Sequence, residues 1–163
     1  MPADFSEIRK RILMGTSYEV PVQLADYGGI EARVRALSEL TLTKIEESTG
    51  VRAIDVIKST EKLRETIQPG DSETTVAEKF LRSFTPEYVR FLAELAIAGL
   101  VVEPDPSCSC GGRDPACEKC SSRALVNAMR GTTVIQLGMA VLEATFADWA
   151  TVESFFSQQR VPS

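Results

Sequence analysis

All four cysteines of the chain lie in one short segment, Cys108-Ser-Cys110-Gly-Gly-Arg-Asp-Pro-Ala-Cys117-Glu-Lys-Cys120. The spacing C-x-C-x6-C-x2-C puts two close thiol pairs on one loop, and four thiolates meet the tetrahedral coordination that structural zinc prefers. Gly111 and Gly112 let the backbone turn sharply so that its N–H groups face the sulfurs, and Pro115 stiffens the return. The segment predicts a closed, structural zinc site with no coordination position left for water.

Other chemistries also use clustered cysteines, and four alternatives stay open at this point. Two disulfides would need an oxidising compartment. An iron–sulfur cluster would need a spacing that matches neither common ferredoxin pattern. Oxidation that expels zinc would make a redox switch, and four free thiols would need no metal. Because the segment itself has almost no core-forming side chains, zinc would replace a missing core there and fix the angle between the two flanking helices.

The clearest β signal spans residues 18–36. Apolar residues alternate with polar residues or proline in two runs: Tyr18, Val20, Val22 and Leu24, then Ile30, Ala32, Val34 and Ala36. Asp26-Tyr-Gly-Gly29 lies between the runs and supplies the positive φ angles of a tight turn. The pattern predicts a β-hairpin with one buried face, and Pro21 places its strand at an edge.

The rest of the chain has the spacing and the caps of helices. A short amphipathic helix is predicted over 4–14. Further predicted starts and stops are Ser38 to Gly50, a helix through Ile54 and Leu63 that Pro69 ends, a capping box of Thr75 with Glu78, Thr85-Pro86 to Gly99, a restart near Ser122, and a last helix capped by Asp148. Thr132 to Phe146 is apolar nearly all round, so it should be the most buried helix.

These elements predict a mainly α fold, in which an N-terminal β-hairpin packs on a helical bundle and a four-cysteine zinc loop is inserted between two helices. We expect a single domain over 1–163. Its parts are the hairpin (18–36), a helical part (38–102), the zinc loop (104–121) and C-terminal helices (122–160).

Composition argues against several classes of function. The formal net charge is −5, whereas nucleic-acid binders usually carry a basic excess, so no nucleic-acid partner is expected. The chain has no histidine, which removes histidine bases and histidine metal ligands, and no other catalytic arrangement is recognisable. The charged N-terminus is unlike a secretory signal, and the longest apolar run is too short to cross a bilayer. We expect a cytoplasmic, non-enzymatic protein without a membrane partner.

Several side-chain groups have a plain structural interpretation beside a functional one. Glu46-Glu47 and the Glu61/Glu65 pair read as solvated ion-pair faces of helices rather than acid–base groups. We interpret Arg33 and Arg35, with Arg52, as solvent-exposed surface rather than as a basic patch that binds a ligand. Trp149, Phe155 and Phe156 belong either to a helix that docks on the core or to an exposed face that grips a partner.

The hairpin with its Tyr-Gly-Gly turn, then Val34-Arg-Ala-Leu-Ser-Glu-Leu-Thr-Leu42, then Ile45-Glu-Glu and a helical body, resembles tail assembly chaperones of tailed phages and archaeal viruses or proviruses. The late segment Leu142-Glu-Ala-Thr-Phe146 is similar in character. The resemblance covers about half of the chain, and the cysteine loop departs from the usual pattern. It implies a protein of the host cytoplasm that binds the helical tape-measure protein and keeps it soluble while the tail tube forms.

A second hypothesis belongs to a different class: a zinc-stabilised adaptor or regulator that contacts a transcription complex. It predicts an exposed basic surface near Arg113, Lys119, Arg123 and Arg130. The chaperone hypothesis predicts apolar grooves and self-association into a homo-oligomer instead. An enzyme would need a pocket with converging polar groups.

Overall fold

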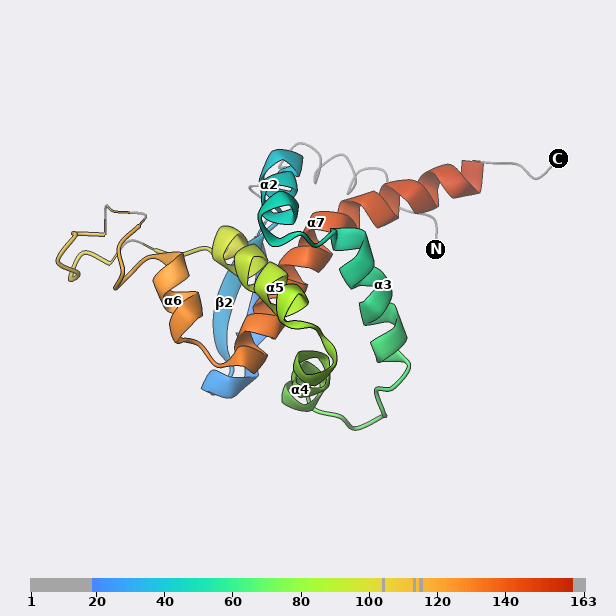
Figure 1. Cartoon of the computed structure of the whole chain (residues 1–163), viewed down its shortest axis with the longest axis horizontal. Helices are drawn as coiled ribbons and strands as arrows, with labels where there is room; N and C mark the ends of the chain where they lie inside the picture. The colour runs from blue at the N-terminus through green and yellow to red at the C-terminus, as the bar shows by residue number, and fades with distance from the viewer. Residues whose placement is uncertain (1–18, 104, 113, 115, 160–163) are drawn as a thin grey trace.

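The computed structural model describes residues 19–103, 105–112, 114 and 116–159, with side chains placed as far as residue 146 (Figure 1). The helix predicted over 4–14, and Tyr18 at the start of the hairpin, lie outside the described residues. Within them the chain is mainly helical, with one antiparallel hairpin and the cysteine loop between two helices, so the predicted fold class is confirmed.

The predicted hairpin is present. Strands β1 (Glu19–Leu24) and β2 (Ile30–Arg35) pair with Val20 opposite Val34, and the 3-10 turn η2 (Ala25–Tyr27) and two glycines with positive φ join them. Val34 is completely buried, as expected for the inner face. Ile30 is 65% exposed although it falls on that face and its register partner Leu24 is buried.

Six helices follow, and most begin and end where the sequence predicts. Their bounds are α2 (Glu39–Thr49), α3 (Ala53–Arg64), α4 (Glu73–Ser83), α5 (Pro86–Gly99), α6 (Ser122–Ala128) and α7 (Gly131–Gln159). The hydroxyls of Ser38 and Thr85 accept hydrogen bonds from the third helical N–H of α2 and α5, as N-caps do. Gly50 ends α2 in the left-handed conformation that glycine adopts without strain.

Two predicted helix starts are wrong. Ser72, not Thr75, caps α4: its hydroxyl accepts from the Thr75 N–H at 3.1 Å, so Thr75 lies inside the first turn. No helix begins after Asp148, because α7 continues through it to Gln159 as one helix. At the start of α4, Ser72 lies three residues before Thr75 and takes the role of cap. In α7, an aspartate inside a long apolar helix costs less free energy than a break in the helix would.

The core forms where α5 and α7 cross, with the hairpin and α4 packed against α7 (Figure 1). Its largest fully buried side chains come mainly from these two helices: Phe91, Leu92, Leu95, Ile135, Leu137 and Val141. Gly138 allows the close approach, because a Cβ there would lie 2.5 Å from the Leu92 carbonyl oxygen. From Thr132 to Phe146, α7 is buried as predicted, while its residue Glu143 stays exposed.

The tip of the hairpin is fastened to the start of α7. The Asp26 carboxylate accepts hydrogen bonds from the hydroxyls of Thr132 and Thr133, the latter at 2.8 Å. The Tyr27 hydroxyl accepts from the Arg130 N–H at 3.3 Å. These bonds join residues far apart in the sequence and fix how the hairpin lies on α7.

In the described part of the chain, no helix combines the length and the apolar character that crossing a membrane requires.

Candidate metal centre

The cysteine loop leaves the body between α5 and α6 and projects beyond α6 (Figure 1). Its first end is held by β2: the Val101 N–H donates to the Arg33 carbonyl at 2.9 Å, and Leu100 pairs with Val34. Its second end is held by Ser121, which caps α6 through a 3.1 Å bond from the Ala124 N–H to its hydroxyl. Both ends of the loop are therefore anchored by the fold around it.

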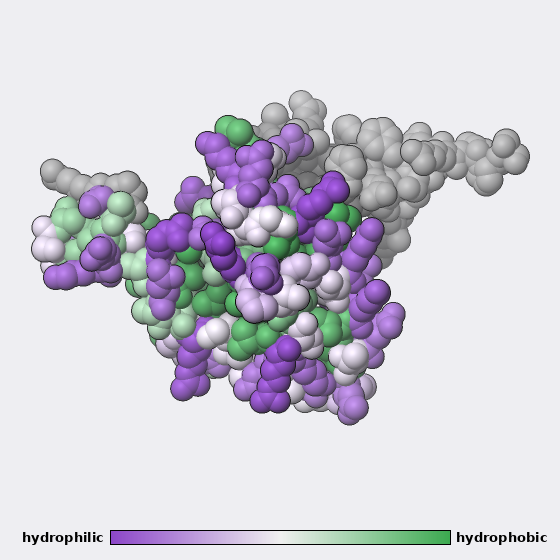
Figure 2. Space-filling model, viewed as in Figure 1, coloured by the Kyte–Doolittle hydropathy of each residue, from purple (hydrophilic) through white to green (hydrophobic). Residues whose placement is uncertain are grey.

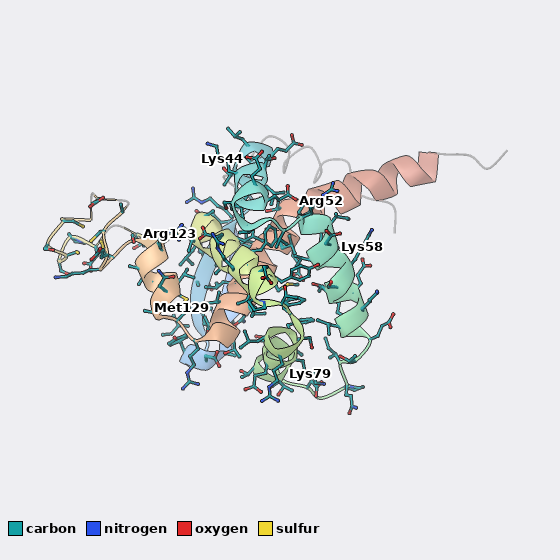
Figure 3. The ribbon with its side chains drawn as sticks, viewed as in Figure 1. Lys44, Arg52, Lys58, Lys79, Arg123 and Met129 are labelled. Atoms are coloured by element: carbon teal, nitrogen blue, oxygen red, sulfur yellow. The ribbon has the colours of Figure 1, made fainter. Side chains whose placement is uncertain are left out.

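The four predicted ligands come together. The sulfurs of Cys108, Cys110, Cys117 and Cys120 all lie within 4.8 Å of one another, and each residue is half-buried. The Sγ–Sγ distance is 3.7 Å from Cys108 to Cys117 and 3.3 Å from Cys110 to Cys120. A disulfide needs about 2.05 Å, so these are four thiols. Such a group could hold one metal ion, and Figure 3 shows sulfur inside this loop.

The closest sulfur pairs are interleaved along the chain, the first cysteine with the third and the second with the fourth. A ligand order of this kind wraps the chain around a single centre instead of closing two separate loops. Metal–sulfur bonds of about 2.3 Å in a tetrahedron put the sulfurs about 3.8 Å apart, so the observed distances require little rearrangement.

The glycines turn the backbone as the sequence predicts. Gly111 and Gly112 have φ angles of 68° and 75°, and the Gly111 N–H donates to the Cys108 carbonyl at 2.8 Å. The backbone N–H groups of Asp114 and Gly112 point at the Cys110 sulfur. Glycine reaches this left-handed region at little cost, which is why the loop can fold so tightly around its sulfurs.

These contacts shift the pKa values of Cys110 and Cys120 in opposite directions. Hydrogen bonds from the Asp114 N–H, and then from the Cys120 thiol, lower the pKa of Cys110 to about 6. The same hydrogen bond raises the pKa of Cys120, because the Cys120 thiol must keep its proton to donate to the Cys110 sulfur. One sulfur is therefore ready to bind a cation at neutral pH. A divalent ion would displace the proton of the Cys120 thiol, because its positive charge stabilises a second thiolate beside Cys110.

Sequence reasoning missed a second link between the helices that flank the loop. Arg123 on α6 forms a bidentate ion pair with Glu94 on α5, at 3.0 and 2.9 Å, and Val126 of α6 is buried. This ion pair raises the pKa of Arg123, chiefly through its hydrogen bonds to Glu94. The two helices are thus in direct contact, in addition to any restraint from a metal in the loop.

The remaining candidate residues do not converge on a second centre in the described residues. Glu46 accepts a hydrogen bond from the Ala53 N–H at 2.9 Å and so caps α3 from the preceding helix. Glu47, Glu61 and Glu65 are exposed. Arg33 forms ion pairs with Glu19 and Glu31 on the solvent-exposed face of the hairpin, as predicted. The side chains of Trp149, Phe155 and Phe156 lie outside the described ones.

Comparisons of the chain with models of protein families, with curated proteins and with solved structures found no match.

Proposed function

We propose that the cysteine loop binds one zinc ion as a structural centre. Four thiolates are soft donors that suit zinc, they complete a tetrahedron, and they leave no position open for catalysis. The supporting observation is the convergence of all four sulfurs within 4.8 Å. Since the loop lacks an apolar core of its own, the ion supplies the folding energy of the loop.

Elemental analysis of the purified full-length chain tests this proposal. We expect one zinc per chain, lost in the Cys110→Ser and Cys120→Ser variants because three thiolates bind far more weakly. Ser109→Ala is the matched control, because Ser109 is exposed between two ligands. Absence of stoichiometric metal, or iron with visible absorption instead of zinc, would contradict the proposal.

We further propose that the chain is a non-enzymatic tail assembly chaperone that binds the tape-measure protein of a tailed virus or provirus. The observation that carries this proposal is local. The residues that bear the resemblance form one continuous unit, in which β2 leads through Leu37 into α2, capped by Ser38. The Leu37 N–H donates to the Thr145 hydroxyl of α7 at 3.1 Å, so this unit is fastened to the longest helix.

The transcription-adaptor hypothesis has less support, because two of the three basic residues it needs that the structure describes lie beside acidic side chains. Arg123 is engaged by Glu94, and Arg130 lies near the carboxylate of Asp26. Lys119 is exposed on the loop, and Arg113 lies outside the described residues.

Coexpression with a tape-measure protein from the same virus or provirus tests the chaperone proposal. We expect the tape-measure protein to stay soluble and to purify as a complex with this chain, and to precipitate when it is expressed alone. An unrelated acidic zinc protein is the control. If the tape-measure protein precipitates in both cases, while the chain binds duplex DNA with a steep salt dependence, the adaptor hypothesis replaces the chaperone.

A further inference from the structure

Two open hollows flank α7. One, of about 610 Å³, lies between β1, α4 and α7, and the other, of about 470 Å³, lies between α3 and α7. Met139 and Glu143 line both, and we call the pair of hollows the α7 groove. Its floor is apolar, formed by residues such as Val22, Val76, Met139, Ala140, Leu142 and Phe146. Figure 2 shows the face on which α5 lies in front of α7, where apolar surface is exposed in small areas among polar side chains.

A bound β-strand is a poor occupant of this groove. The Arg33 carbonyl accepts from the Val101 N–H, so the backbone of Arg33 faces away from β1. Its register partner Pro21 therefore faces away from β2, toward the open edge of β1. Pro21 therefore removes a donor from the middle of the open edge. The Gln136 side chain donates to the Gln23 carbonyl at 2.6 Å and occupies an acceptor on the same edge. An edge without these groups offers no continuous ladder to a peptide.

The rim of the groove is acidic. Within the described residues it carries four carboxylates and one guanidinium: Asp71, Glu73, Glu61, Glu143 and Arg64. Arg64 is engaged by Glu143 at 2.7 Å, and Lys79 from outside the groove engages Asp71 at 2.6 Å. Glu73 accepts a hydrogen bond from the Gln136 side chain at 3.2 Å, which leaves its charge in place. Glu61 and Glu73, on opposite sides of α7, therefore set the charge that a ligand meets.

We propose that the α7 groove binds an amphipathic helix with basic residues along both edges of its apolar face. An apolar floor receives such a helix through side chains spaced three and four residues apart, and the acidic rim selects the charge of its edges. From Ile135 to Phe146 the groove follows α7 for about 16 Å, the length of about three helical turns. The inference rests on the proposed chaperone function, in which the helix is a segment of the tape-measure protein.

Fluorescence anisotropy with two designed peptides tests the chemistry of the ligand. One peptide is an amphipathic helix with a leucine stripe flanked by lysine and arginine, and its twin carries glutamate at the flanking positions. We expect the full-length chain to bind the basic peptide at least about tenfold more tightly, with a smaller ratio at high salt. Equal binding of the twins, or tighter binding of the acidic one, would overturn the proposal.

Variants locate the site. Glu73→Lys and Glu61→Lys should each weaken the basic peptide about three- to tenfold, because each reverses a charge on the rim. Glu78→Lys is the matched control: it is exposed on α4 and outside the groove, so it should change nothing. Val76→Gln should weaken both peptides, with Leu40→Gln on α2 as its control. Circular dichroism verifies that each variant is folded, and equal effects of Glu73→Lys and Glu78→Lys would contradict the assignment.

The same variants separate this inference from the function on which it rests. If Glu73→Lys and Val76→Gln still hold the tape-measure protein in solution, the chaperone proposal stands and the groove is wrong. If sedimentation shows dimers that Val76→Gln abolishes, a second copy is the occupant. If a peptide of residues 1–18 displaces the basic probe at lower concentrations than unlabelled probe does, the chain's own N-terminal segment is the occupant. Either of the last two results overturns the proposal.

Discussion

Asp26 is the residue that most directly fixes the position of the hairpin on α7. Its carboxylate accepts from two hydroxyls at the first turn of α7, and one of them belongs to Thr133, which is completely buried. The bonds from Thr132 and then Thr133 hold the pKa of Asp26 below its ordinary value. The charged form is therefore the one that the fold stabilises, and loss of the charge would leave a buried hydroxyl poorly satisfied.

We expect Asp26→Asn to lower the free energy of unfolding by about 1–2 kcal/mol at neutral pH. Because the folded pKa of Asp26 lies below 3.8, this stabilisation is fully present above that pH and is lost as the pH falls through the folded pKa. Urea unfolding at pH 7 and at pH 3 measures both effects. Asp55→Asn is the control, an exposed aspartate at the start of α3. A difference between wild type and Asp26→Asn that grows at pH 3 would contradict the assignment.

Single residues were predictable where their partners are close in sequence. Ser38 and Thr85 bond to N–H groups three residues away, so the pattern of cap and helix reveals them. Asp26 bonds to residues more than a hundred positions later, and Glu46 caps a helix other than its own. No local pattern marks such residues, because the fold alone brings their partners near.

Among the elements, the α5–α7 pair sets the spacing of the core. Gly138 lies where the two helices come closest, and a Cβ there would be 2.5 Å from the Leu92 carbonyl oxygen and 2.8 Å from the Leu92 Cβ. Backbone cannot move aside as a flexible side chain does. The helices would therefore have to separate, which opens gaps between the large side chains on either side of the crossing.

Gly138→Ala should destabilise the fold by about 1–3 kcal/mol, because the overpacking outweighs a gain in helix propensity of about 1 kcal/mol. Gly131→Ala is the matched control in the same helix. Its nearest neighbour, at 3.1 Å, is the end of the Leu81 side chain, which can rotate away. Thermal unfolding of the two variants separates these expectations, and a Gly138→Ala protein more stable than wild type would show that the crossing is looser than described.

Element boundaries followed from sequence where one strong signal dominated, as with Thr85-Pro86 before α5. They failed where two signals competed. Thr75 with Glu78 imitates a capping box, but Ser72 lies three residues earlier and takes the role. Asp148 is a residue type that often caps helices, but it lies within a run of helix-forming residues, and α7 continues through it.

For the whole molecule, sequence was sufficient for the fold class, the hairpin and the four converging thiols, since each depends on spacing within a short segment. It was insufficient for the layout. The contact of the hairpin with α7, the Arg123–Glu94 pair and the α7 groove all depend on how distant elements meet. Apolar periodicity shows that a face is buried without showing which element covers it.

The two ends of the cysteine loop are fastened independently of the sulfurs between them. Val101 bonds to Arg33 of β2 at one end, and Ser121 caps α6 at the other. The chain could therefore be cut within the loop while both ends of the loop stay attached to the fold. A single backbone cut after Lys119 would divide the molecule into two complementary fragments, one ending in the loop and one beginning with α6 and α7. Each would carry half of the α5–α7 interface, so the fragments should reassemble without a covalent link between them.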